Sequence, residues 1–168
     1  MFDKLIYFLT LVSALGCGLI AGVFFAFSTF VMKALSRLPS AQGMAAMQSV
    51  NVAVLNPWFF TAFFGTAAAC VLLAVFSMLR WHTTAAIYRL IGCALYLVGT
   101  VLVTVVFNVP KNNALAAVEA DTADGATRWA QYVPPWTAWN HVRTAAALAA
   151  AALFTIALVK MTSIESPK

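Results

Sequence analysis

The residues best suited to chemistry lie in one short stretch near the end of the chain, Trp136-Thr137-Ala138-Trp139-Asn140-His141-Val142-Arg143-Thr144. A histidine can accept a proton, an arginine can bind an anion, and an asparagine can donate and accept hydrogen bonds. Pro134 and Pro135 precede the stretch. Because a proline can open a helix but disfavours continuing one, the pair predicts a helix that begins near Trp136.

The polar residues of this predicted helix fall on two stripes. Four residues have the spacing i, i+3, i+4 and i+7, which places them on one face of the helix: Trp136, Trp139, Asn140 and Arg143. Farther round the helix lies a second stripe with Thr137, His141 and Thr144. From one regular helix, His141 and Arg143 cannot point into the same small pocket. If both serve one site, other segments must wrap around this helix.

The composition predicts a membrane protein. Hydrophobic residues make up 63% of the chain and charged residues only 9%, whereas soluble domains carry about 25% charged residues. The net charge of +5 is scattered without a basic run, so nucleic acid is not an expected partner. Three cysteines stand apart in apolar runs and are interpreted as buried small hydrophobic residues: Cys17, Cys70 and Cys93.

Four apolar stretches are long enough to cross a hydrocarbon layer of about 30 Å. They predict an all-α integral membrane four-helix bundle in a single domain, with spans at residues 5–33, 57–79, 86–107 and 138–160. A short interfacial helix is expected within 36–56, after the first span, and a partly helical loop after the third. The lipid bilayer is therefore the first expected partner.

Small residues recur every four positions in the first span, at Ala14, Gly18, Gly22 and Ala26. Such a stripe lets another helix approach closely. We expect it to pack within the bundle of its own chain, and a seam between copies in a homo-oligomer is the alternative.

Other polar residues gather where the spans end. The run Asn108-Val109-Pro110-Lys111-Asn112-Asn113 predicts a helix break, and its Asn108 and Asn112 are candidates to contact a ligand. Further candidates are Ser28, Asn51 and Asn56. The alternative is that the asparagines cap helices or turns and that Trp136 and Trp139 anchor the protein in the interface.

The long connection between the third and fourth spans carries an unusual load of Trp, Tyr and Asn. We therefore expect 108–143 to fold onto the span ends beside Ser28–Lys33 rather than form a free loop. Lysines and arginines divide five against five between the two sides of the membrane, so they do not set the orientation. All three loop acids fall on the side of this connection, which favours cytoplasmic termini.

No metal-ligand spacing, glycine-rich phosphate loop or Ser-His-Asp set is present, and we expect no metal. What remains is one candidate base, His141, a fixed cation, Arg143, several amides and many aromatic rings. This inventory suits an aromatic, weakly acidic ligand. Two alternatives stay open: a small-molecule binding or transport protein without chemistry, and a structural membrane protein.

The chain resembles the anthrone-oxygenase-like family of integral membrane proteins, most of whose bacterial members have no known function. The similarity lies in Gly18-Leu-Ile-Ala-Gly-Val-Phe-Phe-Ala-Phe-Ser28 followed by Val-Met, in Met47-Gln48 with Asn51, in Asn56-Pro57, in Asn108-Val109-Pro110 with Asn112-Asn113, and in Trp136 with Trp139-Asn140-His141-Val142-Arg143-Thr144. The family's usual apolar residue after Asn-Val-Pro is Lys111 here.

The resemblance implies a noranthrone-type monooxygenase, which oxidises a polyketide anthrone to an anthraquinone with O2 and with neither metal nor organic cofactor. His141 would then be the base, and Arg143 and Asn140 would stabilise the anion. Asn108 and Asn112 would orient the phenol oxygens of the substrate. The resemblance also implies a protein of a bacterial inner membrane.

Overall fold

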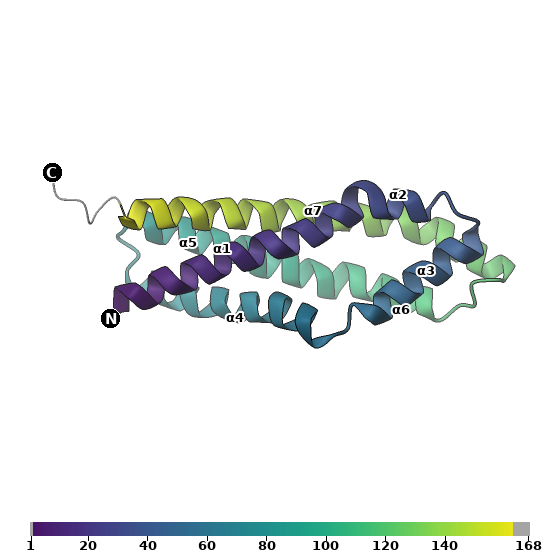
Figure 1. The fold of residues 1–168 in the computed structure, drawn as a ribbon, viewed down its shortest axis with the longest axis horizontal. Coiled ribbons are helices and arrows are strands. Elements are labelled where there is room, and N and C mark those ends of the chain that lie inside the picture. The colour runs from purple at the N-terminus through teal and green to yellow at the C-terminus, as the bar shows by residue number, and fades with distance from the viewer. Residues whose placement is uncertain (1, 163–168) are drawn as a thin grey trace.

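A computed structural model describes residues 2–162 of this chain as a four-helix bundle of membrane-spanning helices (Figure 1). The four candidate spans are Phe2–Leu35, Pro57–Leu79, Thr84–Ala116 and Ala123–Met161. The start of the first and the end of the fourth lie at the same end of the bundle. The protein is therefore an integral membrane protein, as its composition predicts.

The spans are built from consecutive helical elements. The first contains α1 (Phe2–Ala26), the π-helix η1 (Phe27–Val31) and α2 (Met32–Leu35), and a connecting helix α3 (Ser40–Ala53) follows it. The second span is α4 (Pro57–Leu79). The third contains α5 (Thr84–Ala94), the π-helices η2 (Leu95–Leu102) and η3 (Thr104–Asn108), and α6 (Val109–Ala116). The fourth is a single helix, α7 (Ala123–Thr162).

Only α4 has the length of a simple membrane crossing. Its 23 residues span roughly 34 Å at 1.5 Å per residue, close to the thickness of a hydrocarbon layer. Exposed tryptophans flank it at Trp58 and Trp81, as is typical of the two membrane interfaces. The 40 residues of α7 reach about 60 Å. The other three spans therefore project well beyond the bilayer on the side of α3.

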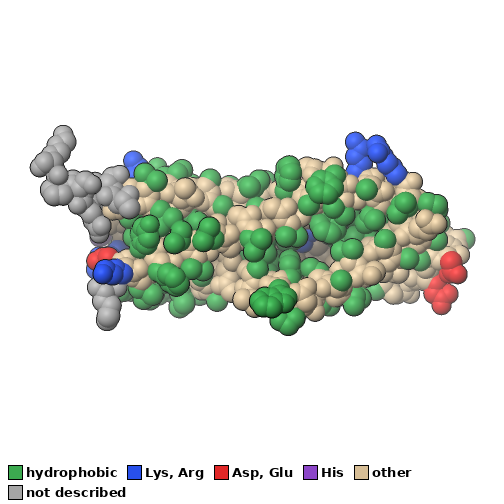
Figure 2. All heavy atoms as spheres, in the orientation of Figure 1, with side chains coloured by type: hydrophobic (Ala, Val, Ile, Leu, Met, Phe, Trp, Pro, Cys, Tyr) green, Lys and Arg blue, Asp and Glu red, His purple; other side chains and the backbone are tan. Residues whose placement is uncertain are grey.

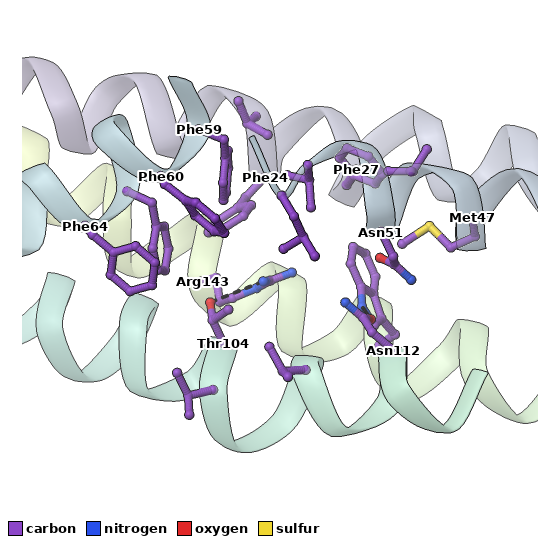
Figure 3. A pocket seen from close by; sticks show the side chains of 18 residues that line it. Phe24, Phe27, Met47, Asn51, Phe59, Phe60, Phe64, Thr104, Asn112 and Arg143 are labelled. Carbon is purple, nitrogen blue, oxygen red and sulfur yellow. Dashed lines mark hydrogen bonds between the residues drawn. The ribbon is translucent and has the colours of Figure 1, made fainter. Parts of the chain in front are cut away.

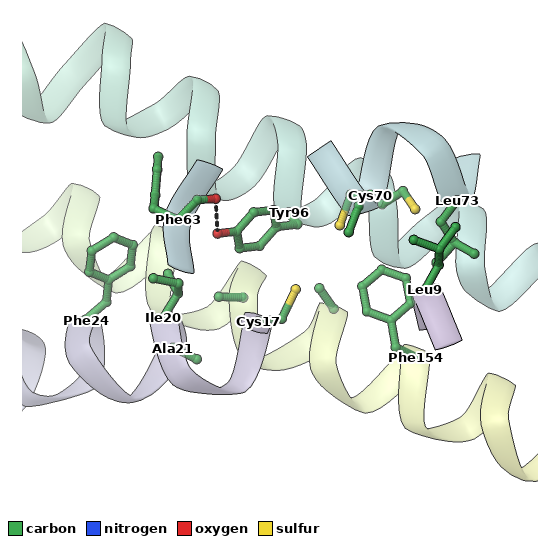
Figure 4. Close-up of a cluster of buried hydrophobic side chains, with 14 of the residues drawn as sticks. Leu9, Cys17, Ile20, Ala21, Phe24, Phe63, Cys70, Leu73, Tyr96 and Phe154 are labelled. Carbon is green, nitrogen blue, oxygen red and sulfur yellow. Dashed lines mark hydrogen bonds between the residues drawn. The ribbon is translucent and has the colours of Figure 1, made fainter. Parts of the chain in front are cut away.

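The membrane-embedded part has its own hydrophobic core, in which α1 packs against α4 and α7. Figure 4 shows the side chains that meet there, among them Cys17, Cys70, Tyr96 and Phe154. The Tyr96 hydroxyl donates a 3.0 Å hydrogen bond to the Phe63 carbonyl, which satisfies a buried polar group between the second and third spans. All three cysteines are free and buried.

A second core lies in the projecting part, where side chains from α2, α3, α6 and the first half of α7 meet. We call it the outer core, and it consists of Met32, Met44, Met47, Leu115, Trp129, Tyr132 and Trp136. Gln48 links α3 to the end of α6, because its side-chain amide donates hydrogen bonds to the carbonyls of Leu115 and Val118. As expected, 108–143 is packed and is not a free loop, since it contacts α3 and η1. It does so as extensions of the third and fourth spans, however, and does not fold back onto their ends.

Two predicted helix boundaries are wrong, and both involve proline. Pro134 and Pro135 lie inside α7 instead of opening it. The two prolines are exposed, in the half of α7 that projects from the membrane, so water can satisfy the carbonyls that lose their intrahelical donors. The helix that carries Arg143 therefore begins thirteen residues before Trp136, at Ala123.

Pro110 does not break the third span either, because a π turn precedes it. The Val109 N–H donates to Thr104, five residues back, and Val109 has helical angles of φ −60° and ψ −46°. Such local π adjustments let a membrane helix accommodate proline. Lys111 Nζ also donates a 3.1 Å hydrogen bond to the Phe107 carbonyl.

The small-residue stripe of the first span does not pack as a whole within the bundle. Gly18 and Gly22 are exposed, and a Cβ added to either would meet no other atom within 4 Å. Close helix contacts are made at other glycines. Gly16 of the same span faces Thr66 of α4, and Gly92 and Gly99 of the third span face Phe154 and Ala146 of α7.

Candidate functional site

Arg143 lies at the centre of the site and is only 4% exposed. Its Nη2 donates to Asn140 Oδ1 at 2.6 Å, and its Nη1 donates to Thr104 Oγ1 at 3.2 Å. The guanidinium carbon lies 4.1 Å from the centroid of the Phe24 ring and 5.2 Å from that of Trp136. Cation–π contacts of this kind hold an arginine in place without neutralising its charge.

Asn140 joins Arg143 to the first span. Its Nδ2 donates to the Phe24 carbonyl and to Ser28 Oγ, each at 2.7 Å. Ser28 Oγ also lies 3.0 Å from Thr144 Oγ1, and Asn140 is fully buried. Asn140 is therefore a positioning residue, since its amide oxygen fixes one of the two terminal guanidinium nitrogens.

Two of these partners lie on π-helical segments. Ser28 belongs to η1 and Thr104 to η3, and the two segments approach α7 from the first and third spans. A π turn adds one residue to the usual turn and is often found at functional sites. Here the π turns bring hydroxyl groups from two helices to the polar stripe of α7.

A cavity of about 190 Å³ opens beside Arg143 (Figure 3). This volume is more than ten times the roughly 10–15 Å³ that one water molecule needs. The lining is mostly aromatic and aliphatic, with rings from Phe24, Phe27, Phe59, Phe60, Phe63, Phe64 and Trp136. Figure 3 shows Phe60 and Phe64 at one end, Asn51 and Asn112 at the other, and Arg143 between them.

The charge of Arg143 has no counter-charge in the described part of the chain. Within residues 2–162 no carboxylate lines the cavity, and the one salt bridge joins Arg80 to Asp3. The buried Arg143 Nε has no hydrogen-bond partner among these residues. A buried cation without a counter-charge is costly, so the cavity is suited to an anion or to a group that becomes negative.

The polar end of the cavity is held rigidly by Asn112. Its Oδ1 accepts hydrogen bonds from the Tyr132 hydroxyl at 2.9 Å and from Trp136 Nε1 at 2.8 Å. Asn108 is buried behind this end and donates to the Trp136 carbonyl at 3.2 Å. The buried Asn108 Oδ1 has no partner within residues 2–162.

The structure brings together part of the set of site residues expected from the sequence. Four of them line the cavity: Asn51, Asn112, Trp136 and Arg143. Asn108 and Asn140 hydrogen-bond to Trp136 and Arg143 from behind. Ser28 is one step farther from the cavity, because it bonds to Asn140. Trp139 lies outside the cavity lining and stacks on Phe107, with ring centroids 3.7 Å apart.

Two expected site residues do not reach the cavity. His141 is exposed on the outer side of α7, since it belongs to the other stripe of that helix, and it is not among the lining residues. Asn56 instead caps α4: its Oδ1 accepts from the Phe59 N–H, and its Nδ2 donates to the Ala53 carbonyl. Capping was the alternative interpretation for this asparagine.

Thr104 and the α4 phenylalanines were missed by sequence reasoning. Phe59, Phe60, Phe63 and Phe64 follow the spacing i, i+1, i+4 and i+5, which gathers rings on one side of a helix. That pattern could have been read as a cavity wall. Nothing in the sequence distinguishes Thr104 from the other threonines, because its role depends on the π turn.

Within residues 2–162 no group of three or more His, Cys, Asp and Glu side chains lies close enough together to hold a metal ion.

The comparisons with known proteins give one result. No curated protein and no solved structure matches the chain. A family model described as anthrone oxygenase matches residues 58–153, more than half of the chain, including α4, the third span and the polar stripe of α7. The chain belongs to the anthrone oxygenase family.

Proposed function

We propose that this protein is a membrane-embedded oxygenase that binds an aromatic, weakly acidic molecule of the anthrone type and promotes its oxidation by O2. The observation that carries the proposal is the buried, unpaired charge of Arg143 on the wall of an aromatic cavity. Rings such as Phe24, Phe63 and Trp136 can pack against a planar substrate. Arg143 would face the substrate oxygen that becomes negative.

The reaction needs no electrons from the protein. An anthrone methylene loses two protons and four electrons as it becomes a carbonyl, and O2 accepts the four electrons. One oxygen atom enters the product, and the other leaves as water with the two protons. The step that a protein can assist is the first deprotonation, because it creates an enolate whose oxygen carries the negative charge.

Arg143 would assist by stabilising that enolate. Its charge-assisted hydrogen bonds are worth about 1.5–3 kcal/mol each, and the fixed position of the guanidinium avoids reorganisation during the reaction. Asn140 and Thr104 orient the guanidinium from two sides. Nη1 and Nη2 each use one of their two N–H groups in these bonds. Their second N–H groups, together with Nε, which has no partner in residues 2–162, are the donors that remain for the substrate.

The structure does not support the expected role of His141 as the base, because this side chain is exposed and outside the cavity lining. We assign proton removal to water at the polar end of the cavity, beside Asn51 and Asn112. In this proposal the protein accelerates the reaction by making the substrate more acidic. The catalytic residue is then Arg143.

Oxygen uptake tests the proposal directly. Purified protein in nanodiscs should accelerate O2 consumption by anthrone above the rate in empty nanodiscs, with anthraquinone as product. Arg143→Gln should abolish most of this acceleration, whereas Arg128→Gln, at an exposed position on the projecting part of α7, should not. Equal rates with protein-containing and empty nanodiscs would reject the proposed reaction.

A second candidate is a binding protein for the same class of ligand. It is favoured by one observation: within residues 2–162 the cavity lining contains no histidine, aspartate or glutamate that could act as a base. Binding of anthrone without its consumption, measured as quenching of tryptophan fluorescence and lost in Arg143→Gln, would identify this function.

A further inference from the structure

We propose that the cavity opens sideways into the membrane and that its ligand, an apolar aromatic molecule with an acidic hydroxyl or enolisable carbonyl, enters from the bilayer between α4 and the third span. The inference rests on the proposed function only in taking this cavity as the ligand site. It does not depend on whether the ligand is oxidised.

The mouth of the cavity is identified by lining residues that are also exposed. On the side of α4 these are Phe60 and Phe64, and on the side of the third span they are Val105 and Val109. Phe64 is 51% exposed and Val105 is 54% exposed. Each of these side chains is apolar, so the rim of the opening has the character of a lipid-facing surface.

The depth of the mouth follows from its position on α4. Trp58, which is 86% exposed, marks one membrane interface. Phe60 and Phe64 lie two and six residues farther along the helix, roughly 3 and 9 Å deeper at 1.5 Å per residue. A hydrocarbon layer is about 30 Å thick, so the mouth lies in its outer third.

The packing of the helices leaves this opening between the second and third spans. α4 packs against α5 and η2, whereas near its N-terminal end the cavity separates it from η3 and α6. Figure 2 shows a hollow near the N-terminal end of α4, with blue side-chain atoms at its floor. Within residues 2–162, Arg143 is the only Lys or Arg in the cavity lining.

The projecting end of the molecule is a poor entrance by comparison. There the outer core fills the space between the helices with Met44, Met47 and Trp129, which are all buried. Within residues 2–162, these packed side chains leave no open route along the bundle axis to Arg143.

These features define the ligand. It crosses the apolar mouth as a neutral molecule, because a charged group is costly at this depth. Its rings then lie among Phe24, Phe63 and Trp136, and its acidic group becomes negative only where Arg143 can stabilise it. A molecule that is always charged, such as a carboxylate with no apolar body, does not fit this route.

Photolabelling from the bilayer tests the route without any turnover. The probe is 3-trifluoromethyl-3-phenyldiazirine, a small apolar aromatic molecule that dissolves in the lipid of nanodiscs and inserts into nearby bonds on illumination. We expect mass spectrometry to find label at Val23 and Phe27, half-buried cavity residues that belong to the first span and not to the two helices that form the mouth. Label at Val98, which is exposed on the lipid-facing surface, provides the internal standard.

A substitution that closes the mouth should remove the label from Val23 and Phe27, which we call the inner label. Val105→Trp should lower labelling of Val23 and Phe27 at least fivefold relative to Val98, and the milder Val105→Leu should lower it less. The matched control is Val106→Trp, one residue away, exposed but outside the cavity lining, and it should leave the inner label unchanged. Stopped-flow binding of anthrone should slow in Val105→Trp for both entry and exit, whereas Val106→Trp should keep the wild-type rates.

Two results would overturn the route. One is wild-type protein labelled at Val98 but not at Val23 or Phe27. The other is inner labelling that Val105→Trp and Val105→Leu leave unchanged. If the inner label behaves as expected while anthrone is never oxidised, the portal stands and the proposed oxygenase reaction fails.

Discussion

Asn140 and Arg143 lie one turn apart on α7 and are joined by a 2.6 Å hydrogen bond from Nη2 of the arginine to Oδ1 of the asparagine. The amide nitrogen of the same asparagine donates to the Phe24 carbonyl of the first span. The position of the guanidinium is thereby linked to α1, whose Phe24 ring lies against it. The following predictions test how much of the site depends on this linkage.

Arg143→Lys should keep the fold and the helix orientation but weaken anthrone binding at least tenfold. A lysine retains the charge that matters for membrane topology, yet it cannot reproduce a planar fork that donates to Thr104 and Asn140 together. Binding is measured by tryptophan quenching, with Arg128→Lys as the control. Wild-type affinity in Arg143→Lys would reduce the arginine to a determinant of topology.

Asn140→Ala should destabilise the bundle and weaken binding together. The change leaves Arg143 Nη2 and Ser28 Oγ without the partner that the structure gives them, and an unsatisfied buried group costs about 1–3 kcal/mol. Unfolding in mixed micelles measures the stability. Asn113→Ala, at an exposed position on α6, should cost less than about 0.5 kcal/mol. Equal costs for the two variants would contradict the bridging role of Asn140.

His141→Ala should change anthrone binding and oxygen uptake less than twofold, because the imidazole is exposed outside the cavity lining. General-base catalysis is worth about 10²–10⁴-fold, so the measurement separates the two roles clearly. A loss of that size in folded His141→Ala protein would restore His141 as the base. It would also require a motion that brings the second stripe of α7 to the substrate.

Gly92→Ala should destabilise the protein by about 1–3 kcal/mol, the usual cost of overpacking a core. A Cβ at this position would lie 2.9 Å from Cε1 of Phe154, whose ring is fully buried and has little room to move. Gly22→Ala, where an added Cβ meets nothing within 4 Å, is the matched control and should not destabilise. Thermal unfolding in detergent compares the two variants.

Hydropathy was sufficient to predict the fold class, because about 20 apolar residues in a row have few alternatives to a membrane helix. The residues at which the helices begin and end were harder to predict. Pro134, Pro135 and Pro110 each predicted a boundary that is absent. The local rule for proline assumes that a lost hydrogen bond is not compensated, and in these places exposure or a π turn compensates for it.

The candidate site was predictable as far as helical periodicity reaches. The spacing placed Arg143 on one face of the helix with Asn140 and Trp136, and it placed His141 on another stripe. In the structure Arg143 is buried and His141 is exposed. Ser28 was a candidate only as a polar residue near the end of a span, and Thr104 was missed. Periodicity could not place either of them at the site, since their approach depends on π turns in other helices. It also gave no cavity, because a cavity is a property of several helices together.

The projecting half of the molecule and the membrane half gain their stability from different sources. Lipid tails are as apolar as the side chains of the embedded core, so close packing and hydrogen bonds stabilise that half. The outer core faces water, and its stability comes largely from the hydrophobic effect, which weakens on cooling. Trp136 belongs to the outer core and touches Arg143. Low temperature should therefore loosen the ligand site from the aqueous side while the embedded helices stay assembled.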